Sequence, residues 1–96
     1  MDYKELDVWK ETKELVKLVY TFTNEMPSNE QFGLTLQIRR AAVSIPSNIA
    51  EGIGRSHTKD TIQFLFIARG SMFELETQLI LCKEIYNLNN AEYDQL

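Results

Sequence analysis

The chain has 96 residues, of which 44% are hydrophobic, and its formal net charge is −4. This length suits one domain spanning residues 1–96, and the hydrophobic content is too high for a disordered chain. No apolar run reaches the roughly 18 residues of a membrane helix, and the N-terminus lacks the basic-then-apolar pattern of a secretory signal. We therefore expect a cytoplasmic protein with no membrane partner.

The charge is distributed unevenly along the chain. Residues 1–34 carry four lysines against seven acids, and residues 70–96 carry one lysine against five acids. The segment between them holds every arginine and only two acids, which predicts a local basic zone although the whole chain is acidic. The five cations of this zone are Arg39, Arg40, Arg55, Lys59 and Arg69.

A first helix is predicted over residues 7–23, with Asp7 as its N-cap. Its apolar positions are spaced four and three residues apart, which is typical of a helix whose one face packs in a bundle. This seam consists of Val8, Thr12, Leu15, Val19 and Phe22.

A central helix is predicted over residues 29–53. Pro46 lies inside it, and we expect a kink rather than a break because the apolar pattern keeps its phase across the proline. Two apolar lines run along this helix, so two neighbours should cover it. The first line is Leu34, Ile38, Ala41, Ala42, Ile45 and Ile49, and the second is Leu36, Val43 and Ala50.

The ends of the central helix carry recognisable signals. Ser28 and Gln31 have the spacing of a capping box, which places Gly33 inside the helix. At the other end, Gly52 and Gly54 are expected to supply the positive φ angles of a C-terminal turn.

A third helix is predicted over residues 58–88, capped by Ser56 or Thr58. Gly70-Ser71 in its middle should allow a close crossing with another backbone. Its seam is Thr61, Leu65, Ala68, Met72, Leu75, Leu79, Cys82 and Tyr86, and a second stripe is Ile62, Phe66, Phe73 and Ile80.

A fourth helix is expected to begin at Asn90, and the sequence ends at Leu96 with most of that helix absent. No segment alternates apolar and polar residues as a strand does. The fold class is therefore all-α.

A polar ridge on the central helix suggests a site. Ser44, Ser47, Asn48 and Glu51 share a face beside Pro46. No base accompanies these hydroxyl groups, because His57 lies beyond the glycine turn, so a buried hydrogen-bonded network is the better interpretation than a catalytic centre. One histidine and one cysteine, Cys82, cannot make an ordinary zinc site, and Cys82 is expected in the core. We predict no enzymatic activity, no cofactor and no metal.

The five central cations allow two interpretations. They could contact the phosphates of a nucleic acid, or they could form ion pairs with Glu51, Glu74 and Glu76 within or between subunits. Ion pairing is favoured, and Arg40 is expected to be buried and hydrogen-bonded on the small-residue ridge.

Two segments carry a family resemblance. The stretch RRAAVSIPSNIAEGIGR at residues 39–55 and the stretch IARGSMFELETQL at residues 67–79 resemble the proteins encoded in intervening sequences of bacterial 23S ribosomal RNA genes, to which diversity-generating-retroelement accessory proteins are related. The resemblance implies an antiparallel up-and-down four-helix bundle, a ring-like homopentamer and no known enzymatic activity. For the retroelement relatives it implies binding to a reverse transcriptase and to nucleic acid.

Two functional hypotheses follow. One is an assembly protein that forms a homo-oligomer and presents a surface to a protein partner. The other is an RNA- or DNA-binding accessory protein that sums weak basic patches over several subunits. The apolar surface of three helices exceeds what a monomer exposes, which predicts a homo-oligomer, and only the resemblance gives five copies.

Overall fold

The computed structural model describes residues 1–86, and every regular element within them is helical. Two short 3-10 helices, η1 (Tyr3–Glu5) and η2 (Ser28–Glu30), precede the first and second of three long helices. These are α1 (Asp7–Thr23), α2 (Leu34–Ile53) and α3 (Thr58–Tyr86). The prediction of an all-α protein is confirmed for this part of the chain.

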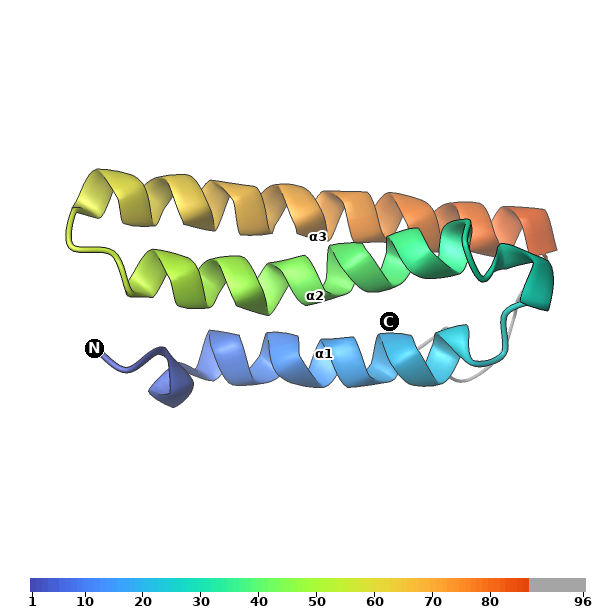
Figure 1. Cartoon of the computed structure of the whole chain (residues 1–96), viewed down its shortest axis with the longest axis horizontal. Helices are drawn as coiled ribbons and strands as arrows, with labels where there is room; N and C mark the ends of the chain where they lie inside the picture. The colour runs from blue at the N-terminus through green and yellow to red at the C-terminus, as the bar shows by residue number, and fades with distance from the viewer. Residues whose placement is uncertain (87–96) are drawn as a thin grey trace.

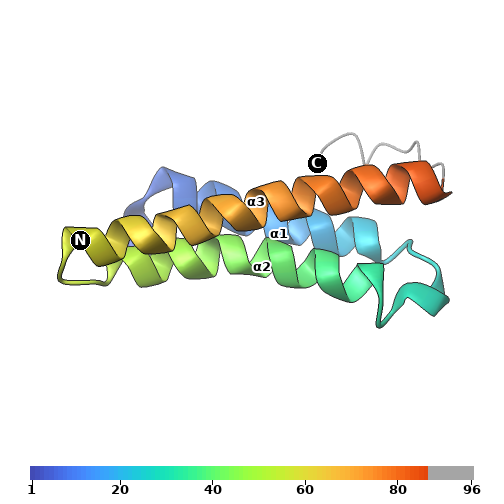
Figure 2. The ribbon, with the colours of Figure 1, turned by 90° about the horizontal axis from the view of Figure 1, so that it is seen from above.

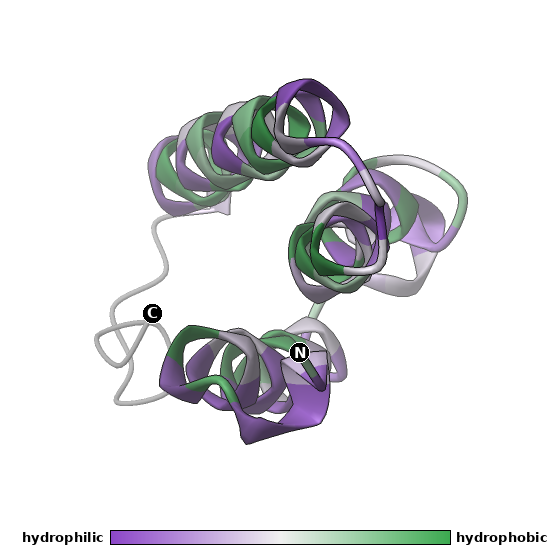
Figure 3. Ribbon diagram, turned by 90° about the vertical axis from the view of Figure 1, so that its left-hand side faces the viewer, coloured by the Kyte–Doolittle hydropathy of each residue, from purple (hydrophilic) through white to green (hydrophobic). Residues whose placement is uncertain are grey.

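The three helices run up and down along one long axis, so that each is antiparallel to the next (Figures 1 and 2). The described helices fill an elongated shape of 44 × 20 × 18 Å. Helix α2 packs closely against both α1 and α3, whereas no Cα atom of α1 lies within 8 Å of a Cα atom of α3. The view along the axis shows α2 at the corner of an open V, with hydrophobic residues along all three helices (Figure 3).

Helix α1 has the predicted bounds, but its N-terminus differs in detail. Asp7 is the first helical residue, and Leu6 occupies the N-cap position without a side-chain hydrogen bond. The Asp7 carboxylate therefore stands in the first turn, where it interacts favourably with the positive end of the helix dipole.

The predicted start of the central helix at residue 29 is wrong. Ser28 belongs to η2, and α2 begins only at Leu34, with Gly33 as its N-cap. The predicted Ser28–Gln31 capping box does not form, because the Glu30 carboxylate accepts the Leu34 N–H group at 3.1 Å instead. A side chain from the preceding 3-10 turn thus satisfies one of the free donors at the start of α2.

Helix α2 continues on both sides of Pro46 and ends at Ile53 as predicted (Figure 1). The expected positive φ angles at its end are absent: Gly54 has φ −77°, and Gly52 is not left-handed either. Gly52 serves close packing instead. A Cβ atom there would lie 3.0 Å from the Phe64 Cβ and 3.1 Å from the Thr61 carbonyl oxygen.

The core lies along α2 and joins it to both neighbours. The first apolar line of α2 is buried as predicted, apart from the half-buried Leu34 at its end. The second line is less covered, because Val43 is exposed and Leu36 and Ala50 are half-buried. The buried hydrophobic residues are Val19, Phe22, Ile38, Ala41, Ala42, Ile45, Ile49, Ala68, Leu75, Leu79 and Cys82.

The predicted seams are only partly buried. Val8 of the first seam is exposed. Leu65 and Met72 of the third seam are exposed as well, because no described element covers that side of α3. Gly70 was expected at a close crossing, yet a Cβ atom there would meet nothing within 4 Å. Helix α3 starts at Thr58 with His57, rather than Ser56 or Thr58, at the cap position, where its carbonyl accepts the Thr61 N–H group. The predicted end at Leu88 and the fourth helix at Asn90 lie outside the described residues.

Candidate functional site

A hydrogen-bonded cluster joins the middle of α2 to the middle of α3. The Asn48 Nδ2 group donates to the carbonyl oxygen and to the hydroxyl group of Ser44, at 2.8 Å in each case. The Ser44 hydroxyl also lies 2.8 Å from the Ser71 hydroxyl across the helix interface. All three side chains are half-buried. Such a cluster stabilises one register of α2 against α3, because sliding the helices would leave its polar groups unpaired.

Two of the four residues of the predicted network lie outside this cluster. Ser47 is exposed and forms no part of the cluster, and Glu51 pairs with Arg55 at 3.1 Å on the surface. Three positions along a helix turn a side chain by roughly 60° from the direction of Ser44, which is enough to move it from the interface to solvent. Ser71 was not predicted as a partner of Ser44, although its place four residues before the buried Leu75 could have indicated it.

Arg39 is a structural residue that ties α2 to the end of α1. Its Nε group donates to the Thr23 hydroxyl at 2.7 Å, and its terminal Nη2 group donates to the Asn24 Oδ1 atom at 3.1 Å. The guanidinium carbon lies 4.4 Å from the centre of the Tyr20 ring. These contacts use several of the donors with which Arg39 could bind a phosphate.

The other four central cations are exposed, and two of them lie over aromatic rings. Arg55 stacks on Phe64, at 4.6 Å from the ring centre, and Arg69 lies 5.5 Å from the centre of the Phe73 ring. Arg40 is exposed rather than buried as expected, because its position on α2 points away from both neighbouring helices. Lys59 is also exposed. Of the ion pairs expected for these cations, Arg55–Glu51 forms, whereas neither Glu74 nor Glu76 forms a salt bridge with an arginine among the described residues.

A second polar cluster joins the C-terminal end of α3 to the start of α2. The Tyr86 hydroxyl of α3 donates to Glu30 Oε2, while Glu30 Oε1 accepts the Leu34 N–H group. These two hydrogen bonds lower the pKa of the Glu30 carboxyl, and the Glu30 bond raises the pKa of Tyr86. Burial, with a smaller contribution from the charge of Glu30, raises the pKa of the Cys82 thiol to about 11. Cys82 is thus a buried, protonated core residue rather than a nucleophile.

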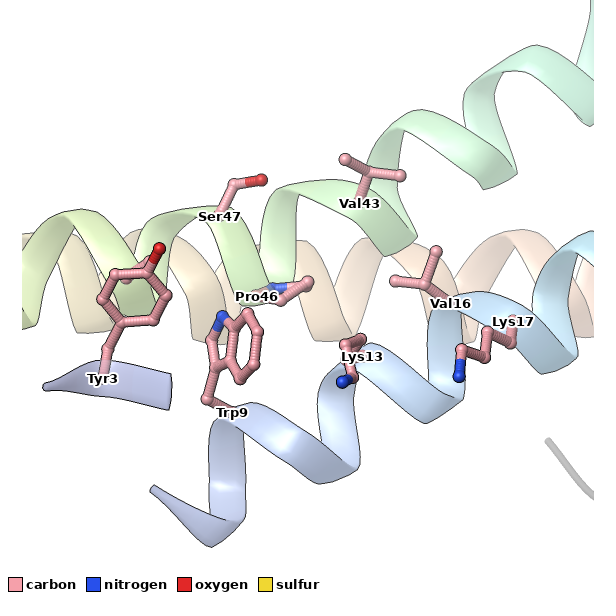
Figure 4. A pocket seen from close by; sticks show the side chains of 9 residues that line it. Tyr3, Trp9, Lys13, Val16, Lys17, Val43, Pro46 and Ser47 are labelled. Atoms are coloured by element: carbon pink, nitrogen blue, oxygen red, sulfur yellow. The ribbon is translucent and has the colours of Figure 1, made fainter. Parts of the chain in front are cut away.

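A hollow with a mixed apolar and polar lining lies between α1 and α2 (Figure 4). Its volume is about 350 Å³. The Trp9 indole points from α1 towards Pro46, and the Tyr3 ring meets Trp9 edge-on at 5.2 Å between centres. We name this hollow the α1–α2 groove; its lining is Tyr3, Trp9, Lys13, Val16, Lys17, Val43, Pro46, Ser47 and Ala50.

The arrangement contains few reactive features. Within residues 1–86, no three potential ligands among His, Cys, Asp and Glu gather where they could hold a metal ion. None of the described helices is both long and apolar enough to cross a membrane. The polar clusters join helices, and no described histidine or carboxylate lies in hydrogen-bond contact with Ser44 or Ser71.

A family model described as the 23S rRNA-intervening sequence protein matches residues 4–96, which is nearly the whole chain. The chain belongs to this family. No curated protein matches the sequence significantly. In this 23S rRNA-intervening sequence protein, residues that carried the resemblance have structural roles. Asn48 and Ser71 join α2 to α3 through Ser44, and Gly52 allows the two helices to approach closely.

Proposed function

We propose that this 23S rRNA-intervening sequence protein is a non-enzymatic, homo-oligomeric helical-bundle protein that serves as an assembly or interaction module. The observation that carries the proposal is the surface of α3. Large hydrophobic side chains remain exposed on several sides of this helix: Ile62, Leu65, Phe66, Ile67, Met72, Phe73, Ile80, Leu81 and Ile85.

A soluble monomer rarely leaves so much contiguous apolar surface in water. A helix that is apolar on most sides is normally covered on most sides. A fourth helix packed across the open side of the V would complete an antiparallel four-helix bundle and cover the side of α3 that carries Leu65 and Met72. The side of α3 that carries Phe66 and Phe73 would still need a partner.

The copy number that we propose is five, which rests on the family resemblance alone. Size-exclusion chromatography with light scattering tests it directly. A mass close to five times 11.2 kDa supports the pentamer. A mass of 11.2 kDa at micromolar concentration would refute the assembly role.

Nucleic-acid binding is the second candidate. Arg40 and Lys59 are exposed and form no ion pair with a described acid, which leaves their charges available to a phosphate. The net charge of −4 per subunit opposes such binding, so we expect it to be weak. In a gel-shift assay, phosphate contacts would give a log–log salt slope of about −0.9 per duplex phosphate neutralised. Tight binding at physiological salt that Arg40→Ala and Lys59→Ala abolish would make this the primary function.

A further inference from the structure

The α1–α2 groove is a feature separate from the exposed surface of α3. Its lining comes from η1, α1 and α2, and none of its residues belongs to α3. Its volume of about 350 Å³ lies within the range of small-molecule sites, which are mostly apolar and carry a few placed polar groups. Neither the polar clusters nor the surface proposed for assembly makes use of this groove.

Aromatic and aliphatic side chains form most of the groove. The half-buried Trp9 indole points from α1 towards Pro46 of α2 (Figure 4). The Tyr3 ring lies beyond Trp9 at one end of the groove, and Val16 and Val43 lie at the other end (Figure 4). Such walls stabilise an apolar body between them, because they remove it from water.

The polar side chains of the groove favour a ligand that accepts hydrogen bonds. Lys13, Lys17 and the indole N–H group of Trp9 can only donate, whereas the hydroxyl groups of Tyr3 and Ser47 can donate and accept. No Asp or Glu is among the lining residues. The lining is therefore suited to the oxygen atoms of an anion.

Lys13 supplies the free charge of this lining. Its ammonium group lies 5.2 Å from the centre of the Trp9 ring, a cation–π contact that holds the charge beside the apolar wall. Lys13 forms no ion pair with a described acid, whereas Lys17 is paired with Glu14 at 3.1 Å. The charge that an incoming anion meets in the groove is thus that of Lys13.

We infer that the α1–α2 groove binds a small amphipathic carboxylate. The apolar body of this ligand lies between Trp9 and Pro46, and its carboxylate group meets the ammonium group of Lys13. An organic cation would be repelled by Lys13, and the acid of the adjoining hollow, Glu51, is already paired with Arg55. The site does not depend on the proposed homo-oligomeric function, because one subunit supplies its whole lining.

The fluorescence of Trp9 tests this site directly, because Trp9 is the only tryptophan of the chain. Sodium octanoate is the probe, since it joins an apolar chain to a carboxylate. Octanol and octylammonium are the matched probes, with the same apolar chain and with no charge or a positive charge. In titrations of the full-length chain below the micelle concentration, octanoate should give a saturable change in fluorescence. Octanol should bind more weakly, and octylammonium more weakly still.

Lys13→Gln tests the role of the charge. We expect it to raise the dissociation constant of octanoate by about three- to fivefold, the effect of losing an exposed charge pair, and to leave that of octanol unchanged. Lys10→Gln is the matched control, since Lys10 is exposed on the same helix but does not line the groove; it should leave both constants unchanged. Lys13 is itself exposed, so its variant should keep the fold, which circular dichroism checks.

Three outcomes would contradict the inference. Octanoate that leaves the Trp9 fluorescence unchanged would show that the groove is not the site. Equal affinities for octanoate and octylammonium would show that charge does not select the ligand. Octanoate binding that is lost in Lys59→Gln and kept in Lys13→Gln would place the carboxylate on α3, beside Ile62 and Phe66.

Light scattering of the same samples reports on assembly separately. A monomer that binds octanoate would refute the proposed homo-oligomeric function and leave this site standing. An oligomer that does not bind octanoate would leave the proposed function standing and refute the site.

Discussion

Helices α2 and α3 have similar composition and opposite situations. About half of the residues in each are apolar. In α2 only Val43 remains exposed among the large hydrophobic side chains, whereas α3 exposes nine. Among the described helices, α2 lies between two neighbours, whereas α3 packs closely against α2 alone. The difference shows that apolar content indicates how much surface must be covered, while the position in the bundle decides how much of it the same subunit covers.

The contrast is clearest at Ile45 of α2, whose side chain is fully buried. Ile45→Ala should lower the free energy of unfolding by about 2–5 kcal/mol, the cost of lost burial and a cavity. Ile62→Ala on α3 is the matched control and should cost less than about 1 kcal/mol. Both changes are measured by urea unfolding in a chain that also carries Phe73→Asp, which places a charge on the exposed side of α3 and should keep the subunits apart. Equal losses would mean that α3 is covered within one subunit as fully as α2.

The Asn48–Ser44–Ser71 cluster links the two helices, and its removal would loosen them from each other. Asn48→Ala removes two hydrogen bonds and should lower the free energy of unfolding by about 1–3 kcal/mol, because partly buried partners are left unpaired. Ser47→Ala, one position away and exposed, should change it by no more than about 0.5 kcal/mol. If thermal melting of Asn48→Ala matches that of the wild type, the cluster does not hold the helix pair together.

Gly52 and Gly70 sharpen the comparison, because replacing each by alanine should change the stability of the fold in opposite directions. Gly52→Ala brings a methyl group against Phe64 and the Thr61 carbonyl, and we expect a net loss of about 1 kcal/mol after the gain in helix propensity. Gly70→Ala in the Phe73→Asp monomer should instead add up to about 1 kcal/mol. Thermal melting of the two variants decides it, and two changes of the same sign would contradict this assignment of close packing.

The smallest expected effect concerns the buried side of α3 and is visible only at alkaline pH. The pKa of Cys82 is raised to about 11, and the pKa of Tyr86 is raised as well, so both groups ionise more readily in the unfolded chain. Stability should therefore be complete below about pH 9 and fall as the pH rises towards 11. Melting temperatures between pH 8 and 11 measure this, with Tyr86→Phe as the common background. Cys82→Ala in that background should melt lower throughout but with a shallower decline; an identical slope would mean that Cys82 is not protected by burial.

Local patterns predicted the helices well and their termini poorly. Residues 7–23 formed α1, and the apolar line from Ile38 to Ile49 was buried, since both depend on helix periodicity. The start of α2 was missed because Glu30, rather than Ser28, supplies the capping oxygen. Periodicity also placed Leu65 and Met72 in a seam without showing that no described helix would cover them.

The candidate sites were predicted by residue type more than by geometry. The hydrogen-bonding role of Asn48 could be anticipated from its place on a polar ridge, but Ser71 comes from a helix 27 residues away from Ser44 in sequence. Arg39 and Arg40 are adjacent and chemically identical, yet one is held by Thr23 and Asn24 and the other faces solvent. The local sequence could not distinguish the two arginines, because the partners of Arg39 lie at the end of α1.

By itself, the sequence determined that this protein is helical and that both α2 and α3 carry more than one apolar line. It also placed residues without a side chain at positions 52 and 70, where another backbone could come close. These properties follow from the 3.6-residue period and from side-chain size, which are local. Only the tertiary structure decided that Gly52 packs against Phe64 while Gly70 faces open space, and that Phe66 and Phe73 lie outside the core. The physical reason is that burial belongs to pairs of surfaces: α3 is apolar on more than one face, and the position of α2 selects the one that is covered.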